Sequence, residues 1–347
     1  EEPFTQGSKV GIGSQVNVEI QIAPMQINKT ELVPLLSDSS TLEHSPNIML
    51  DGVQADFTTD SNASIFNGDI NIGKISMEDL ATKEGRFINI QLSPSTFSAN
   101  ADEIYLGNLL IGTFKGNLPE LRVKADSTDV IIAKNITTKN IAAEQNQSWF
   151  SDLSFKIDEV TINDPTLSEP FSGANFNLYT KIYGYDLEKM RHLAKIIHEQ
   201  EVEAITTSAK QSQTTEQAEK LILTALGETI QAGSGVNLLV EIDTKQSNSK
   251  LDFDIQYTSE QKITDVTDVT NIAEIFEALK GTLDVQLDKT MIKGTDLEAI
   301  LATPPANELF IESETAFNLN STLDKGELKV NEHLIPILEM FGLNTAN

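Results

Sequence analysis

The chain has 347 residues, of which 39% are hydrophobic, so it can bury a sizeable core as two or three domains or as one elongated body. Its 52 Asp and Glu residues outnumber 25 Lys and Arg residues, and the net charge of −27 opposes binding to nucleic acid and to anionic lipid head groups. The absence of cysteine excludes disulfides, thiol nucleophiles and thiolate metal sites.

The first half of the chain, from Gln15 to about Asp164, predicts β-structure. Apolar and polar residues alternate in short runs between Gly, Asn, Asp and Ser residues, which is typical of an antiparallel sheet. The predicted strands are 16–22, 47–57, 64–75, 86–92, 104–114, 121–125, 130–133 and 153–162. Asn67-Gly68-Asp69 predicts a tight hairpin turn. The slip in the alternation at Asp158-Glu159 predicts a bulge.

The middle of the chain predicts two helices that pack as a hairpin against a sheet. Residues 186–209 lack helix breakers and carry an apolar stripe at helical spacing, formed by Leu187, Met190, Leu193, Ala194 and Ile197. A polar break at 210–213 precedes a second helix at 215–231, which Thr214 and Gln217 cap. Its predicted buried stripe consists of Ala218, Leu221, Ile222, Ala225, Leu226 and Ile230.

The last third returns to β-structure with short helices. Strict alternation predicts strands at 238–242 and 251–257, and a cap at Asn271 predicts a helix over 272–279. Further strands are predicted at 283–287, 310–319 and 327–330, with a turn at Asp324-Lys325-Gly326. A closing helix is predicted over 334–341.

One pattern of apolar residues occurs twice, near the two ends of the chain. Identical spacings relate Val18, Ile20, Ile22, Ile27, Leu32, Leu35 and Leu36 to Leu283, Val285, Leu287, Ile292, Leu297, Ile300 and Leu301. The alternating part predicts a strand, and the later spacings of three and four predict a short helix. We therefore expect residues 16–36 and 283–301 to adopt the same local structure.

Three segments of the chain resemble the YdgA-like family of bacterial proteins of unknown function. They are the stretch from Asn177-Leu178 to Asp186-Leu187-Glu188 with its long helix, the second helix leading into 238–242, and Gly326-Glu327-Leu328-Lys329-Val330-Asn331 followed by Leu334-Ile335-Pro336. The resemblance covers most of the chain, although Glu332 stands where the family usually has Gly. Family members typically carry an N-terminal signal anchor before an envelope-facing region, so the resemblance implies a periplasmic location. It implies no catalytic residues.

No arrangement of residues predicts a catalytic or metal centre. His192 and His198 lie on one predicted helix about 240° apart around its axis, whereas a metal-binding pair is usually four residues apart. The acidic clusters at 265–268 and 284–288 lack the spacing of a calcium loop. We therefore expect a non-enzymatic protein without a metal or cofactor. An uncharacterised hydrolase stays open as a third alternative, because 52 acids allow many chance carboxylate pairs.

One aromatic pair, Trp149-Phe150, is the candidate contact site of the chain. The pair lies in a very polar stretch, and adjacent side chains of a strand point to opposite faces, so one ring would be exposed to a partner. Packing of both rings at the edge of a strand is the alternative.

These patterns predict a β-dominated α+β protein with elongated, curved antiparallel sheets, a central helical hairpin and short strand-linked helices. The predicted regions are a β-rich region at 1–170, a helical hairpin region at 171–235 and a β-rich region with short helices at 236–347. One continuous elongated body is the alternative arrangement.

The expected function is non-enzymatic binding or scaffolding in the bacterial envelope, with a carrier of lipid or another apolar ligand as the alternative. The expected partner is an unknown protein, an apolar ligand or a second copy of the chain, and not nucleic acid. The chain begins with Glu1-Glu2-Pro3 rather than Met and has no run of about 20 apolar residues. We therefore expect membrane contact only through a removed N-terminal segment. The expected location is the periplasm or the periplasmic side of the inner membrane.

Overall fold

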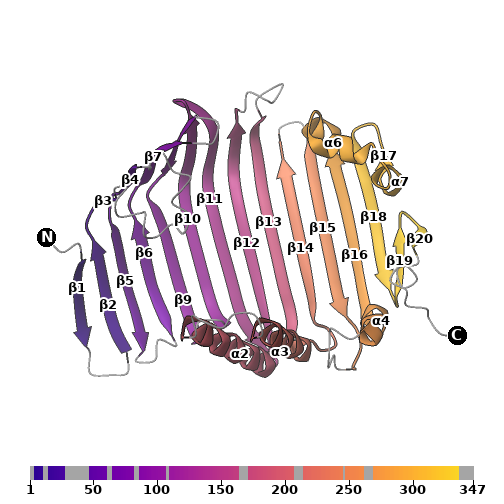
Figure 1. Ribbon diagram of the computed structural model, residues 1–347, viewed down its shortest axis with the longest axis horizontal. Coiled ribbons are helices and arrows are strands. Elements are labelled where there is room, and N and C mark those ends of the chain that lie inside the picture. The colour runs from indigo at the N-terminus through magenta and orange to yellow at the C-terminus, as the bar shows by residue number, and fades with distance from the viewer. Residues whose placement is uncertain are drawn as a thin grey trace.

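The computed structural model describes residues 4–10, 15–27, 47–60, 65–81, 86–106, 109–163, 171–206, 214–244, 247–261 and 269–335. Most of these residues belong to one large antiparallel sheet, and helices lie at the ends of its strands (Figure 1). This arrangement confirms the prediction of a β-dominated protein with a large antiparallel sheet and a few helices.

The strands before the first described helix are β1 (Phe4–Val10), β2 (Gln15–Ile22), β3 (Met25–Ile27), β4 (Asn47–Leu50), β5 (Val53–Asp60), β6 (Phe66–Ile72), β7 (Ile75–Ala81), β8 (Phe87–Leu92), β9 (Ser95–Tyr105), β10 (Leu109–Ala125), β11 (Thr128–Gln145), β12 (Ser148–Ile162) and β13 (Phe171–Asp186). The later strands are β14 (Gly235–Asp243), β15 (Asn248–Tyr257), β16 (Leu279–Asp288), β17 (Ile311–Glu312), β18 (Ala316–Asp324), β19 (Glu327–Val330) and β20 (His333–Ile335). The helices are α2 (Leu187–Thr206), α3 (Thr214–Thr229), α4 (Val269–Ala278), α5 (Lys289–Ile292), α6 (Asp296–Leu301) and α7 (Ala306–Leu309).

The sheet follows the order of the chain. Antiparallel pairing runs through β1, β2, β5, β6, β9, β10, β11, β12, β13, β14, β15, β16, β18, β19 and β20. β3, β4, β7 and β8 extend β2, β5, β6 and β9 toward the upper edge of the sheet in Figure 1. Pairing is continuous across residues 170 and 235, which separate the three predicted regions, so these regions share one sheet.

Breaks in the regular strand geometry follow a line across the N-terminal strands, near the upper edge of the sheet in Figure 1. It passes between β2 and β3 at Pro24 and between β4 and β5 at Gly52, whose φ of 97° lies in the left-handed region. A Cβ atom on Gly52 would lie 2.8 Å from the carbonyl oxygen of Ile22, so only glycine fits there. The line reaches β12, where the register shifts between Ile157 and Val160 and confirms the predicted bulge at Asp158-Glu159.

The fully buried hydrophobic clusters of the described residues lie at the lower ends of the strands, beside α2, α3 and α4 (Figure 1). One joins Leu109 of β10 to Leu187 and Ala194 of α2. A second joins α2 to α3, and a third joins the end of β15 to α4. The chain exposes 22078 Å², whereas a compact monomer of this mass would expose about 14,000 Å². An extended sheet with little second-layer cover accounts for this large surface.

Several strand and turn predictions are wrong. Asn67-Gly68-Asp69 lies inside β6 instead of at a turn, because Gly68 allows close approach of Phe57, whose Cβ would lie 2.4 Å from an added methyl group. The predicted strand at 104–114 is two strands, and Leu106 lies between them with a φ of 51°. The predicted strand at 310–319 is likewise divided into β17 and β18.

The predictions for the helices are correct in position but partly wrong in orientation. α2 and α3 confirm the two central helices, yet Leu221 and Leu226 of the predicted buried stripe are 47% and 40% exposed. Ala225 is the buried residue that contacts α2. The closing helix predicted over 334–341 is also wrong at its start, because β20 includes Leu334 and Ile335. Its remainder, 336–341, lies outside the described residues.

The two repeated units differ after their strands. Met25–Ile27 forms strand β3, whereas the equivalent stretch of the second unit ends helix α5 at Ile292. Asp288 starts that helix by accepting a hydrogen bond from the backbone N–H of Thr290 at 2.7 Å, and Ala23 at the equivalent position has no such side chain. α6 confirms the helix of the second unit, and the predicted helix of the first lies outside the described residues.

Candidate functional site

The register of the strands sorts the side chains of the sheet into two faces. Alternate residues of a strand point to opposite faces, and paired residues of neighbouring strands share a face. One such row crosses the sheet from β2 to β18, and apart from Gly116 and Thr138 it consists of Ile20, Ala55, Ile70, Phe97, Phe155, Leu178, Val240, Leu251, Val285 and Leu319. We call the face that carries this row the apolar face.

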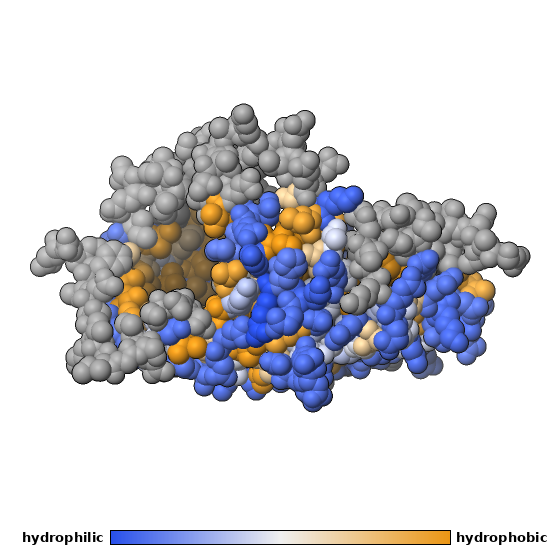
Figure 2. All heavy atoms as spheres, turned by 90° about the horizontal axis from the view of Figure 1, so that it is seen from below, coloured by the Kyte–Doolittle hydropathy of each residue, from blue (hydrophilic) through white to orange (hydrophobic). Residues whose placement is uncertain are grey.

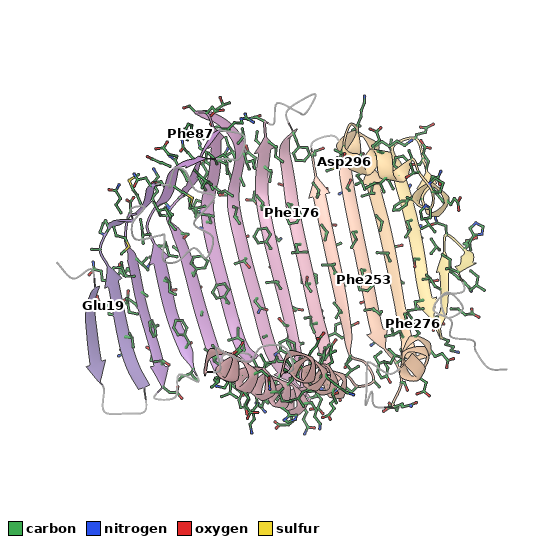
Figure 3. All side chains as sticks on the ribbon, in the orientation of Figure 1. Glu19, Phe87, Phe176, Phe253, Phe276 and Asp296 are labelled. Atoms are coloured by element: carbon green, nitrogen blue, oxygen red, sulfur yellow. The ribbon has the colours of Figure 1, made fainter. Side chains whose placement is uncertain are left out.

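Neighbouring rows on the apolar face are also largely hydrophobic. Phe114, Leu153, Leu238, Phe253 and Leu283 belong to one of them, and Ile136, Ile157, Phe176 and Ile242 to another. Figure 3 places Phe176 and Phe253 between the two ends of β13 and β15. Gly116 leaves room for the Phe97 ring, since an added Cβ would lie 2.9 Å from that ring. The apolar face therefore extends across the sheet without a charged residue in these rows.

Most large side chains of the apolar face remain partly accessible to solvent. Phe97, Phe155, Leu178, Val240 and Leu251 are neither fully buried nor fully exposed. In the part of the chain that the structure describes, every fully buried hydrophobic cluster includes a helix. Figure 2, a view from below the strands, shows a hollow over the N-terminal strands whose visible lining is hydrophobic. The apolar face thus offers hydrophobic surface that a ligand could contact.

The opposite face carries a polar depression, which we call the lysine trough. It encloses about 990 Å³ and spans β6 and β9–β14. Two rows of polar side chains line most of it, namely Asp69, Ser98, Lys115, Lys139, Ser154 and Tyr179 in one row and Asn71, Thr96, Asn117, Thr137, Lys156 and Asn177 in the other. A smaller depression of about 400 Å³ continues it over β6, β9 and β10.

The electrostatics of the lysine trough differ from those of the whole chain. Lys115 lies directly opposite Lys139, and Lys156 is a diagonal neighbour of Lys139. Burial raises the pKa of the Tyr179 hydroxyl above its ordinary value, and the nearby charge of Asp152 raises that pKa further. The Tyr179 hydroxyl donates a hydrogen bond to Asp152 at 3.2 Å. Tyr179 is therefore a neutral group on the wall of a cationic depression.

Trp149 and Phe150, the predicted contact residues, lie at the lower end of β12. Trp149 packs against the cluster of Leu109, Leu187 and Ala194, and its indole N–H donates a hydrogen bond to the carbonyl oxygen of Leu110 at 3.2 Å. Phe150 is also partly buried. The structure thus gives Trp149 a packing role beneath α2 and places neither residue in the lysine trough.

An ion pair holds α2 against the sheet beside this cluster. Arg191 donates two hydrogen bonds to Glu103 of β9, at 2.9 and 2.7 Å, and it also pairs with Glu188. The bonds to Glu103 raise the pKa of the Arg191 guanidinium. Bidentate pairing of this kind fixes orientation as well as distance. Arg191 therefore fixes the position of α2 relative to β9.

The histidines of the described residues lie apart from one another. His192 and His333 are exposed and His198 is partly buried, on α2 and β20. No group of three or more His, Asp or Glu residues with metal-binding geometry occurs within the described ranges. Within those ranges, too, no helix combines the length and the hydrophobicity that a membrane span requires.

Sequence analysis did not identify the lysine trough. Lys115, Lys139 and Lys156 belong to three strands and are up to 41 residues apart in the chain. Alternation with apolar neighbours assigns Lys156 to a polar face, but Lys139 lies between Thr138 and Asn140, and no local pattern relates the three lysines to one another. The strand register supplies that relation.

Comparison with known proteins identifies a family. The family model described as "Bacterial protein of unknown function (DUF945)" matches residues 1–335. No curated protein and no solved structure matches the chain.

Proposed function

This chain belongs to the DUF945 family of bacterial proteins of unknown function, and we propose that it is a non-enzymatic binding protein of the cell envelope whose ligand is an aliphatic chain. The ligand would lie on the apolar face, as the acyl chain of a lipid does in a carrier. The observation that carries this proposal is the row of hydrophobic side chains from Ile20 to Leu319, broken at Gly116 and Thr138, whose large side chains remain partly accessible.

The composition of the apolar face favours an aliphatic ligand over a protein partner. Protein interfaces are enriched in Trp, Tyr and Arg, and these residues dominate their binding energy. The rows of the apolar face instead consist mainly of Ile, Leu, Val and Phe. Such side chains offer no hydrogen bonds, which suits a ligand that has no polar groups to satisfy.

The expected affinity is sufficient for a carrier. Each buried methylene group contributes about 0.8 kcal/mol, so ten of them would contribute about 8 kcal/mol. The loss of translational and rotational freedom on association offsets several kcal/mol of this free energy. The remaining binding free energy corresponds to reversible binding. A location in the periplasm, which the family resemblance implies, would place such a protein between the two membranes that exchange lipid.

Mass spectrometry of organic extracts from the purified protein tests the proposal. We expect a lipid or fatty acid at a stoichiometric amount in the unaltered chain. Leu178→Asp, which adds a charge to the apolar face, should abolish it, whereas Asn177→Asp adds the same charge to the opposite face and should retain it. If Leu178→Asp does not fold, Val240→Thr replaces it as the test. This milder change keeps nearly the same volume and should lower the amount of bound lipid. Extracts free of aliphatic molecules, together with no binding of added fatty acid, would refute the proposal.

A further inference from the structure

We propose that the lysine trough is a second binding site, specific for an acidic oligosaccharide whose carboxylate or phosphate groups contact Lys115, Lys139 and Lys156. This site lies on the face opposite the apolar face, so the inference stands independently of the aliphatic ligand. It rests on the shape of the trough, on the placement of its charges and on the side chains that surround them.

The three lysines form a concentrated positive charge in a strongly negative protein. The net charge of the chain is −27, yet β10, β11 and β12 bring three lysines together on one face. Lys115 and Lys139 are directly paired in the register, an arrangement of like charges that destabilises a sheet. A sequence with 52 acids could readily supply a carboxylate at either position. The cost in stability indicates that the lysines serve binding.

Carboxylates are present at the borders of the trough and not at its centre. Among the described residues, no ion pair involves Lys115, Lys139 or Lys156. Asp69 lines one end and Glu241 the other, and Glu241 faces Lys250 on β15 in the register. Asp152 accepts the hydrogen bond of Tyr179. The three ammonium groups are therefore available to an anionic ligand.

The spacing and the lining of the trough indicate the class of ligand. Neighbouring strands lie about 4.8 Å apart, so the lysines offer positive charge over a span of about 10 Å. That span exceeds the width of a single phosphate group, and it suits an extended molecule with several acidic groups. Hydroxyl and amide side chains, including Thr96, Asn117, Thr137, Ser154 and Asn177, line the trough and match the hydroxyl groups of a sugar. Tyr179 adds an aromatic side chain to the wall.

Calorimetric titration with tetragalacturonate tests this site, with neutral maltotetraose as the comparison ligand. We expect the unaltered protein to bind tetragalacturonate, with an affinity that falls as salt rises, and not to bind maltotetraose. The double variant Lys115→Gln/Lys139→Gln should lose at least about tenfold in affinity. Lys280→Gln, on the same face of β16 but remote from the trough in the sheet, should leave the affinity within about twofold.

The thermal midpoint without ligand separates binding from folding. Because the double variant removes two opposed like charges, its midpoint should equal or exceed that of the unaltered protein. A midpoint lowered by several degrees would show that the lysines serve folding and would overturn the inference. So would equal binding of the acidic and neutral sugars, an absence of binding to tetragalacturonate, or an equal loss in Lys280→Gln.

Discussion

The packing of α2 against α3 gives a sharp test of the fold, because one helix residue is buried and a matched one is exposed. Leu193 of α2 is 7% exposed and belongs to the cluster with Ile196 and Ala225. Leu221 of α3 is 47% exposed. Replacing either leucine by alanine changes the helix propensity by the same small amount, so the difference between the two variants isolates burial.

Leu193→Ala should lower the free energy of unfolding of the helical region by about 2–4 kcal/mol, since it removes buried methyl groups and leaves a cavity. Leu221→Ala should lower it by less than about 0.5 kcal/mol. Urea unfolding followed by circular dichroism at 222 nm measures both, and amide hydrogen exchange in α2 reports local opening if the helices unfold before the sheet. Equal losses in the two variants would refute this placement of the helices.

Two further predictions concern the ends of the strands. Arg191→Lys should weaken the attachment of α2 to β9 by about 1–2 kcal/mol, because lysine cannot form both hydrogen bonds to Glu103. A double-mutant cycle with Glu103→Gln should show a coupling free energy of about 1 kcal/mol. Additive losses of stability in the two single variants would contradict this prediction. Burial and then the charge of Asp254 raise the pKa of Tyr183 above its ordinary value, so its contribution to stability is complete below about pH 10 and is lost as pH rises through the raised pKa. The stability of Tyr183→Phe should therefore fall less steeply than that of the unaltered protein as pH rises above about 10, and identical pH profiles would contradict the assignment.

Elements with local signals could be predicted from the amino-acid sequence. Alternating apolar residues predicted β14, β15 and β16, and helical spacing predicted α2 and α3 in their observed places. The turn residues Asp324-Lys325-Gly326 correctly separated β18 from β19, and the slip at Asp158-Glu159 marked a true bulge. Each of these signals depends on neighbours within a few residues, so a single sequence is sufficient to show it.

The tertiary structure alone decided which residues meet. Asn67-Gly68-Asp69 is a turn by local preference, but pairing with β5 and β9 keeps it in a strand, where Gly68 admits Phe57. The sequence likewise could not show that Leu221 is exposed while Ala225 packs against α2. Lys115 and Lys139 are 24 residues apart and become opposite neighbours only through the register of β10 and β11. Register depends on hydrogen bonds between distant segments, and a one-residue slip would reverse both faces. For that reason, only the assembled sheet defines the apolar face and the lysine trough.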